Sequence, residues 1–434
     1  MRVHFIGIGG IGLSALARFL NFDGHSVSGS DMKSSSITKE LEKEGIKVSC
    51  PQEAKNISDD LDLVIYSAAV TDENPELIEA RLKQIRTLSR KEALPIILGD
   101  KKNYCVAGAH GKSTTTAILA TILQSSALIG AISKEFGSNF RYVDKTVAFE
   151  ADESDASFLL SNPYCAIVTN AEPEHMEYYH YDYDKFYESY ETFLSLAKKR
   201  VVNGEDKDIQ KLKIEDATYL YPSKDIKNLC YTLKDGQPCT KFDLKDYGTF
   251  EVWGFGFHIA SNASLAILAA LNELDIETIR KNLLNYEGIK KRFDIVQSND
   301  KFVVIDDYAH HPTEIEATMK SVELYDNLTN FNNRIVLWQP HKYSRTSDNL
   351  EGFKKCFRRC DELIILPLWT VAGEKKIDID FEKEFASYNP IFADRVVSYK
   401  GKIELIKDDK IIKTYDEGIF LGVGAGDITY QLRY

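Results

Sequence analysis

Short apolar runs alternate with helical patterns along most of this chain, and that alternation constrains the fold more than any other feature. Runs rich in β-branched residues, such as VHFIGI (3–8) and FVVI (302–305), are each followed by a turn and then by a helical pattern. Parallel strands need crossover connections, usually helical, so this order is typical of helices packed on parallel sheets. We therefore predict an α/β fold with mostly parallel sheets.

The chain is too long for one ordinary hydrophobic core. Its 434 residues divide into three blocks of strand and helix patterns. Polar residues between about 211 and 254 interrupt the second block and suggest smaller strands. We predict three domains, at 1–100, 101–288 and 289–434.

Charge and hydropathy exclude several classes of protein. The formal net charge of −12 argues against a nucleic-acid partner, which demands a basic surface. No apolar run approaches the roughly 18 residues that a membrane-spanning helix needs. The first residues, MRVHFIGIGGIGL, lack the basic region and cleavage site of a signal peptide. We expect a cytoplasmic protein without a membrane partner.

A glycine motif, Gly7-Ile-Gly9-Gly10-Ile-Gly12, joins the first strand pattern to the first helix pattern. Glycines there allow a tight turn and bring phosphate close to backbone N–H groups at the helix start. Asp31 ends the next strand pattern, where such folds place an acid on a ribose hydroxyl. The motif predicts a nucleotide or dinucleotide site, and NAD is the commonest ligand of this pattern.

A second glycine motif, 108–115 (GAHGKSTT), also lies between a strand pattern and a helix pattern. It has two residues between its glycines where the general P-loop has four. A lysine and a hydroxyl at a helix start still suit a nucleotide phosphate and its Mg²⁺. We predict that the motif binds a nucleotide's phosphates, with Lys112 on the β- and γ-phosphates and Ser113 on Mg²⁺.

Acids and a histidine lie at or beyond the ends of the next two strand patterns. Glu150 lies near the end of TVAFEAD (146–152) and Glu153 directly follows that run, while His175 comes after CAIVTN (165–170). Alone, these are most simply solvated loop residues. Beside a phosphate loop they predict a magnesium site, since Mg²⁺ prefers oxygen ligands and His175 would be an unusual but permissible addition.

Two polar clusters follow strand patterns of the third block. The segment 306–313 reads DDYAHHPT, and the segment 339–346 reads QPHKYSRT. Open α/β sheets bind ligands beyond the carboxyl ends of their strands, so both segments are candidate binding sites.

The order of the motifs along the chain resembles that of the Mur ligase family. These motifs are the two phosphate loops, EADESD, TN with a later histidine, DDYAHHPTE and QPHKYSRT. The resemblance covers essentially the whole chain, including Gly424-Ala-Gly426-Asp427. It is strongest to the members that join L-alanine to UDP-N-acetylmuramate. It implies a Rossmann-like N-terminal domain for the UDP-sugar, a central P-loop domain for ATP, and a Rossmann-like C-terminal domain for the amino acid. It also implies that the first glycine motif holds a UDP-sugar rather than NAD.

The resemblance assigns candidate site residues one by one. The UDP-sugar would contact Gly9, Gly10, Asp31, Ser67 and Arg90. ATP would contact Gly108, His110, Gly111, Lys112, Ser113, Thr114, His258, Asn262, Arg292 and Asp307. The metal ligands would be Ser113, Glu150 and His175, with Glu150 preferred over Glu153 because it lies twenty-five residues before His175. The catalytic and alanine-binding set would be Lys112, His310, His311 and Arg345.

Two positions depart from the family pattern. Ile259 stands where an asparagine is usual, which predicts a missing contact to adenine or ribose. Ala109 stands where threonine is typical.

The implied reaction has two steps. The lactyl carboxylate of UDP-N-acetylmuramate attacks the γ-phosphoryl group of ATP, and the amine of alanine then attacks the acyl phosphate. Three alternatives stay open: a recycling ligase that joins a tripeptide to the same sugar nucleotide, an NAD(P)-dependent oxidoreductase, and an ATP-hydrolysing regulatory protein.

Overall fold

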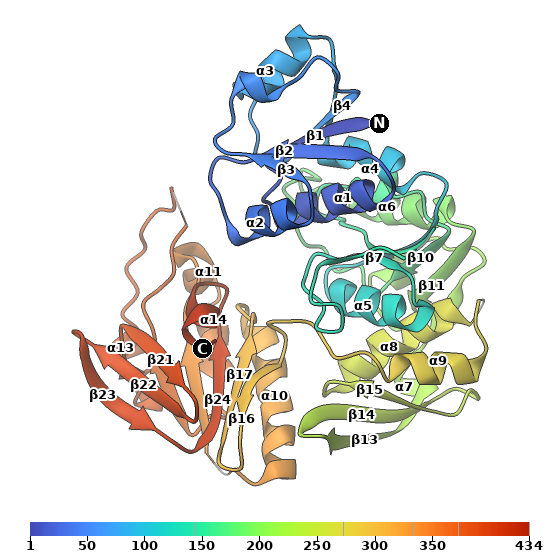
Figure 1. Cartoon of the computed structure of the whole chain (residues 1–434). Coiled ribbons are helices and arrows are strands. Elements are labelled where there is room, and N and C mark those ends of the chain that lie inside the picture. The colour runs from blue at the N-terminus through green and yellow to red at the C-terminus, as the bar shows by residue number, and fades with distance from the viewer. Residues whose placement is uncertain (144, 272, 332, 372, 434) are drawn as a thin grey trace. The chain divides into compact units, whose positions relative to one another are not determined.

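The computed structural model describes residues 1–143, 145–271, 273–331, 333–371 and 373–433. The chain forms two compact units (Figure 1). The first comprises Met1–Leu229, Phe242–Val252 and His258–Glu287, and the second comprises Cys230–Lys241, Trp253–Phe257 and Gly288–Tyr434. The predicted α/β class with mostly parallel sheets is confirmed. The domain boundaries at residues 100 and 288 stay a prediction.

The first unit begins with a five-stranded parallel sheet in the order β3-β2-β1-β4-β5. Its strands are β1 (Arg2–Ile6), β2 (Ser26–Ser30), β3 (Lys47–Ser49), β4 (Leu63–Tyr66) and β5 (Arg86–Ser89). Its helices are α1 (Ile11–Phe22), α2 (Ser36–Lys43), α3 (Pro75–Leu82) and α4 (Arg90–Leu98). Alternate strand residues pack on opposite faces: Phe5 and Ile65 face α1 and α4, while Ile6 and Val64 face α3 (Figure 1). The order reverses at β1, where the first glycine motif emerges.

The same unit contains a seven-stranded sheet in the order β12-β11-β10-β6-β9-β7-β8, in which only β8 runs antiparallel to its neighbour. Its strands are β6 (Lys102–Ala107), β7 (Ser126–Leu128), β8 (Phe140–Arg141), β9 (Thr146–Glu150), β10 (Cys165–Val168), β11 (Lys199–Asn203) and β12 (Thr218–Leu220). Helices α5 (Lys112–Leu123), α6 (Tyr183–Leu196), α8 (Phe257–Ala270) and α9 (Ile276–Leu283) follow in chain order. Because β6 lies between β9 and β10, the loops after all three strands meet at one edge. That edge carries the second glycine motif.

The polar stretch between 211 and 254 forms short α7 (Pro222–Asp225) and the strands β13 (Ile226–Lys234), β14 (Gln237–Leu244) and β15 (Thr249–Trp253), besides β12. The last three make a three-stranded sheet in that order. The expectation of smaller strands in this stretch is confirmed.

The second unit is built on a six-stranded sheet in the order β16-β17-β24-β18-β19-β20, parallel except for β16. Its strands are β16 (Asp294–Ser298), β17 (Phe302–Asp307), β18 (Arg334–Trp338), β19 (Glu362–Ile365), β20 (Ile391–Phe392) and β24 (Gly418–Val423). Its helices are α10 (Pro312–Thr329), α11 (Tyr343–Asp348), α12 (Leu350–Cys356), α13 (Phe381–Glu384) and α14 (Ile428–Gln431).

Both faces of that sheet are covered. Val303 and Trp338 pack with α10 and α12, while Val304 and Leu337 pack with α14 and a second, antiparallel sheet. This sheet, β21 (Arg395–Tyr399), β22 (Lys402–Lys407) and β23 (Lys410–Tyr415), was not predicted from sequence. No helix of the described residues is both long enough and apolar enough to cross a membrane.

Candidate active site

The first glycine motif forms the turn between β1 and α1. Gly7 has a φ of +82°, which L side chains rarely adopt, and Gly10 precedes the first residue of the helix. The backbone N–H of Gly9 donates a 2.8 Å hydrogen bond to the Asp31 carboxylate, and a Cβ on Gly9 would lie 2.8 Å from the same oxygen. Ser67, after β4, lies against Gly7. Gly9, Gly10, Asp31 and Ser67 are therefore gathered at one edge of the sheet.

Arg90 joins that edge to the loop that follows β9. It is the first residue of α4, and its guanidinium lies 3.7 Å from Asp152 and 3.9 Å from Asp155. Its Nη1 atom is also 3.3 Å from where a Cβ on Gly12 would stand. Burial alone would raise the pKa of Asp152, but hydrogen bonds from Ser154 and the charges of Lys112 and Arg90 bring that pKa below its usual value.

The second glycine motif is a tight turn between β6 and α5. Gly108 and Gly111 have φ values of +132° and +85°. A Cβ on Gly108 would lie 2.3 Å from the Thr169 hydroxyl, and one on Gly111 would lie 2.7 Å from the Asn262 side-chain oxygen. Only glycine fits these two positions, and the second contact places Asn262 of α8 directly against the loop.

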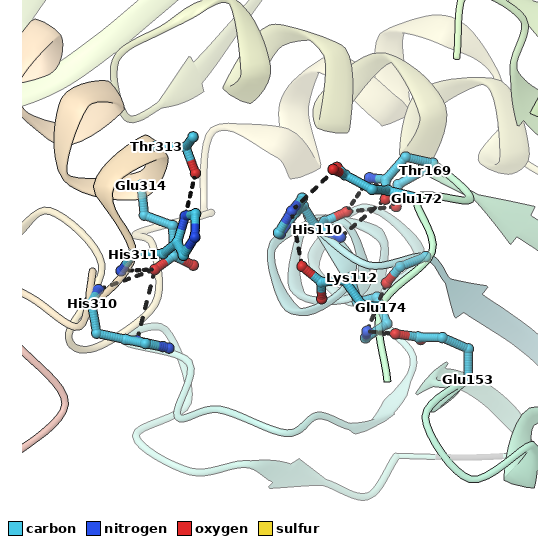
Figure 2. Close-up of polar contacts among 12 residues, drawn as sticks. His110, Lys112, Glu153, Thr169, Glu172, Glu174, His310, His311, Thr313 and Glu314 are labelled. Atoms are coloured by element: carbon cyan, nitrogen blue, oxygen red, sulfur yellow. Dashed lines mark hydrogen bonds and ion pairs between the residues drawn. The ribbon is translucent and has the colours of Figure 1, made fainter. Parts of the chain in front are cut away.

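Lys112, the first residue of α5, is held by a carboxylate (Figure 2). Its ammonium lies 2.7 Å and 2.8 Å from the two oxygens of Glu153, and it also donates to the carbonyl oxygen of Gly108 at 2.6 Å. The Glu153 side chain is buried, and burial raises its pKa in spite of the lysine.

Ser113 and Glu150 form the oxygen-rich part of the candidate metal site. The Ser113 hydroxyl donates to one Glu150 oxygen at 3.0 Å, and the backbone N–H of Gly130 donates to the other at 2.7 Å. In the described part of the chain no three histidine, cysteine or acidic side chains gather as a metal-binding group. One carboxylate with one hydroxyl still suits Mg²⁺, which usually completes its shell with water and substrate phosphates.

A cavity of about 300 Å³ lies beside Glu150 within the first unit. Its polar lining includes Arg90, Lys112, Glu150 and His175. Its apolar lining includes Leu16, Leu94, Leu128, Ile129 and Phe149. The cavity therefore joins residues of the first glycine turn region, the phosphate loop and the candidate metal site.

His110 lies in the phosphate loop and faces two acids that follow β10 (Figure 2). Its Nε2 atom is 3.6 Å from Glu172 and 3.4 Å from Glu174. Thr169 and Asn170 donate to its carbonyl oxygen at 2.6 Å and 2.8 Å. The TN pair after β10 thus fixes the phosphate loop.

The helix that carries Asn262 also carries His258 and Ile259. His258 is exposed, whereas Ile259 is buried at 9% exposure. The Ile259 side chain therefore packs into the core.

In the second unit, Asp307 ends β17 and is buried. Its two oxygens accept 2.8 Å hydrogen bonds from the backbone N–H groups of Phe293 and Ala309. Burial raises its pKa to about 6. Arg292 is exposed beside this anchored loop and lowers the same pKa by its charge.

His310 and His311 precede α10 and share one acidic partner (Figure 2). Both backbone N–H groups donate to Glu314, at 3.0 Å and 3.1 Å. The His311 ring contacts Thr313 at 2.8 Å and Asn349 at 3.0 Å, so both of its nitrogens have partners. Burial lowers the pKa of His310, which favours a neutral ring.

Arg345 lies on α11, and its Nη1 atom is 2.8 Å from Nδ1 of His341. The rings of His341 and His310 are 6.2 Å apart. Burial, together with the Arg345 charge, lowers the pKa of His341 to about 4. His310, His341 and Arg345 thus form one polar group in the second unit.

Sequence reasoning missed three of these relationships: the Lys112–Glu153 pair, the Arg90–Asp152 contact and the His341–Arg345 contact. The first could have been suspected, because EADESD supplies more acids than one metal site needs. The second depends on how two separate segments of the chain meet, and the third depends on the local turn between residues 341 and 345.

Family models match three consecutive parts of the chain. They are Mur ligase family, catalytic domain (residues 2–102), Mur ligase middle domain (106–270) and Mur ligase, glutamate ligase domain (291–408).

Curated relatives and solved structures match the chain over nearly its whole length. A UDP-N-acetylmuramate–L-alanine ligase of Campylobacter curvus is 55% identical over 433 residues, covering 100% of this chain and 99% of the relative. A UDP-N-acetylmuramate–L-alanine ligase of Helicobacter pylori (strain P12) is 52% identical over 436 residues, covering 100% of this chain and 96% of the relative. The crystal structure of the UDP-N-acetylmuramate–alanine ligase of Thermotoga maritima matches with a TM-score of 0.78 at 27% identity, covering 99% and 97%. A murein peptide ligase of Psychrobacter arcticus matches with a TM-score of 0.62 at 20% identity, covering 99% and 97%, which shows a shared fold.

Proposed function

Because the chain belongs to the Mur ligase family, we propose that it is an ATP-dependent ligase that joins L-alanine to the lactyl carboxylate of UDP-N-acetylmuramate in peptidoglycan precursor synthesis. The observation that carries this proposal is the full-length match to relatives named for that reaction. The oxidoreductase alternative is set aside, because the segment with the first glycine motif falls in a Mur ligase domain.

The phosphate loop would bind ATP. Gly108, His110 and Gly111 shape the loop, Thr114 would contact the nucleotide from the first turn of α5, and Lys112 would neutralise charge on the transferring phosphoryl group. Such charge stabilisation, with correct positioning of the attacking carboxylate, is what phosphoryl transfer chiefly needs. His258, Asn262, Arg292 and Asp307 complete the proposed nucleotide contacts. The Asn262 contact with Gly111 supports its part, while Asp307 would act by anchoring the loop that carries Arg292.

Ser113, Glu150 and His175 would hold Mg²⁺. When bound, the ion supplies positive charge to the phosphate oxygens. The hydrogen bond between Ser113 and Glu150 supports Glu150 as the carboxylate ligand, because Glu153 is engaged by Lys112.

The UDP-sugar would bind at Gly9, Gly10, Asp31, Ser67 and Arg90. The cavity that Arg90 shares with Lys112 supports this placement, because the sugar's carboxylate must reach the γ-phosphate. An anionic substrate there would meet the guanidinium now shared by Asp152 and Asp155.

Alanine would bind in the second unit, through Arg345 with His310 and His311. The lowered pKa of His310 supports a neutral imidazole that can accept a proton from the attacking amine. The His311 ring, held by Thr313 and Asn349, would orient its neighbours rather than transfer protons.

We place this activity in the cytoplasm, where ATP and free alanine are supplied. The test is incubation of the protein with ATP, Mg²⁺ and UDP-N-acetylmuramate plus either L-alanine or the murein tripeptide, with products identified by mass. The proposal requires the alanyl product. A product formed only with the tripeptide would assign the recycling reaction instead.

A further inference from the structure

The Lys112 ammonium has no hydrogen-bonding capacity left for a phosphate. An ammonium has three N–H donors, and three acceptors lie within 2.8 Å of it: the Gly108 carbonyl oxygen and the two oxygens of Glu153. A phosphate oxygen can gain a direct bond from Lys112 only if one of these contacts is given up.

Of these contacts, only those with Glu153 join two opposite charges, so losing them would leave a carboxylate without its counter-charge. Glu153 is 2% exposed, so its carboxylate depends on Lys112 for compensation. The Tyr179 hydroxyl donates to the Glu153 backbone carbonyl oxygen at 2.7 Å, which anchors the backbone of Glu153. Glu150 faces Ser113 and Gly130, so the two acids of this loop have separate partners.

We propose that Glu153 is a positioning residue that acts through Lys112. It holds the ammonium away from the phosphate site until the nucleotide's phosphates compete for it. This rests on the proposed role of Lys112 in ATP binding. As a consequence, the measured affinity for ATP equals the intrinsic affinity multiplied by the fraction of protein in which Lys112 is free.

The competition predicts a difference between nucleotides. ATP carries the β- and γ-phosphates that Lys112 would contact, whereas AMP lacks both. Removing the charge of Glu153 should therefore strengthen ATP binding and leave AMP binding unchanged. A merely structural role for Glu153 would affect the two nucleotides alike.

The experiment measures equilibrium binding of ATP with Mg²⁺, and of AMP, to the full-length protein by calorimetry, without the sugar nucleotide. Glu153→Gln should bind ATP at least about fivefold more tightly than the unmodified protein, as expected if Lys112 is free at most about a fifth of the time. Its AMP affinity should stay within about twofold. Asp155→Asn is the matched control, because it removes the same charge from the same loop without touching Lys112.

Unchanged or weaker ATP binding by Glu153→Gln would overturn the inference. Equal tightening of ATP and AMP binding in that variant would also overturn it. So would ATP binding that tightens as much in Asp155→Asn as in Glu153→Gln. If Glu153→Gln does not fold, Glu153→Asp keeps the charge but shortens the side chain, and should tighten ATP binding by a smaller factor. ATP binding without any Glu153 effect would leave the proposed function standing. No ATP binding by the unmodified protein would remove both.

Discussion

The Ser113 hydroxyl donates a hydrogen bond of 3.0 Å to Glu150, although the two residues are 37 positions apart in the chain. They come from the helix start after β6 and from the end of β9, which are adjacent parallel strands. The contact preassembles a hydroxyl and a carboxylate at the edge where a phosphate would enter.

Glu150→Gln should raise the Mg²⁺ concentration needed for half-maximal activity. A carboxamide carries no charge, so we expect an increase of about tenfold or more, comparable with other losses at metal sites. A Mg²⁺ titration of the initial rate measures this. Glu188→Gln, an exposed position on α6, is the control and should match the unmodified protein. An unchanged Mg²⁺ requirement in Glu150→Gln would remove this residue from the metal site.

Lys112→Ala should lower turnover at least about 10²-fold, because the transferring phosphoryl group loses charge stabilisation. It should also destabilise the fold by roughly 3–5 kcal/mol, because the buried Glu153 carboxylate loses its partner. Denaturant unfolding measures the second effect. Lys112→Ala combined with Glu153→Gln should recover much of the stability and none of the turnover. If the single variant keeps full stability, the ion pair is not the compensation that Glu153 needs.

Arg345→Lys should raise the KM for alanine at least about tenfold and leave the KM for ATP within a few-fold. Alanine offers little besides its two charges, and a lysine cannot reproduce the bidentate grip of a guanidinium on a carboxylate. Steady-state kinetics with each substrate varied in turn measure the three KM values. A KM for alanine that does not move would shift the alanine site towards His310 and His311.

Stability should fall as the pH is lowered from about 6.5 to about 4, in part because of His341. Burial lowers the pKa of His341 in the folded protein to about 4 from its ordinary 6.5. Between these values the unfolded chain binds a proton that the folded chain does not, so acid favours unfolding. His341→Gln should make the free energy of unfolding depend less steeply on pH in that window. An identical slope in the variant would contradict the assignment.

The motif positions were predictable because parallel strands place their carboxyl ends together. Gly9 with Asp31, and Ser113 with Glu150, follow from that rule once the strands are recognised. The surplus of acids in EADESD could suggest a partner for Lys112 but not which acid it is. Glu150 ends β9 and Glu153 follows three residues later, and only the backbone path decides which of them faces the lysine. The pairing of His341 with Arg345 depends on one turn of a short helix.

Some of the fold also escaped sequence reasoning for physical reasons. The strands 395–399, 402–407 and 410–415 are short, and 410–415 exposes apolar Ile411 and Ile412, so their pattern lacks a clear buried face. Their pairing is antiparallel and local, unlike the parallel alternation around them.

The dependence of ATP turnover on the sugar nucleotide tests the central claim most directly. Phosphate release would be measured with ATP, Mg²⁺ and L-alanine, in the presence and absence of UDP-N-acetylmuramate. Because the acyl phosphate needs the lactyl carboxylate, we predict negligible release without the sugar nucleotide and sustained release with it. Equal ATP hydrolysis under both conditions would contradict the ligase account.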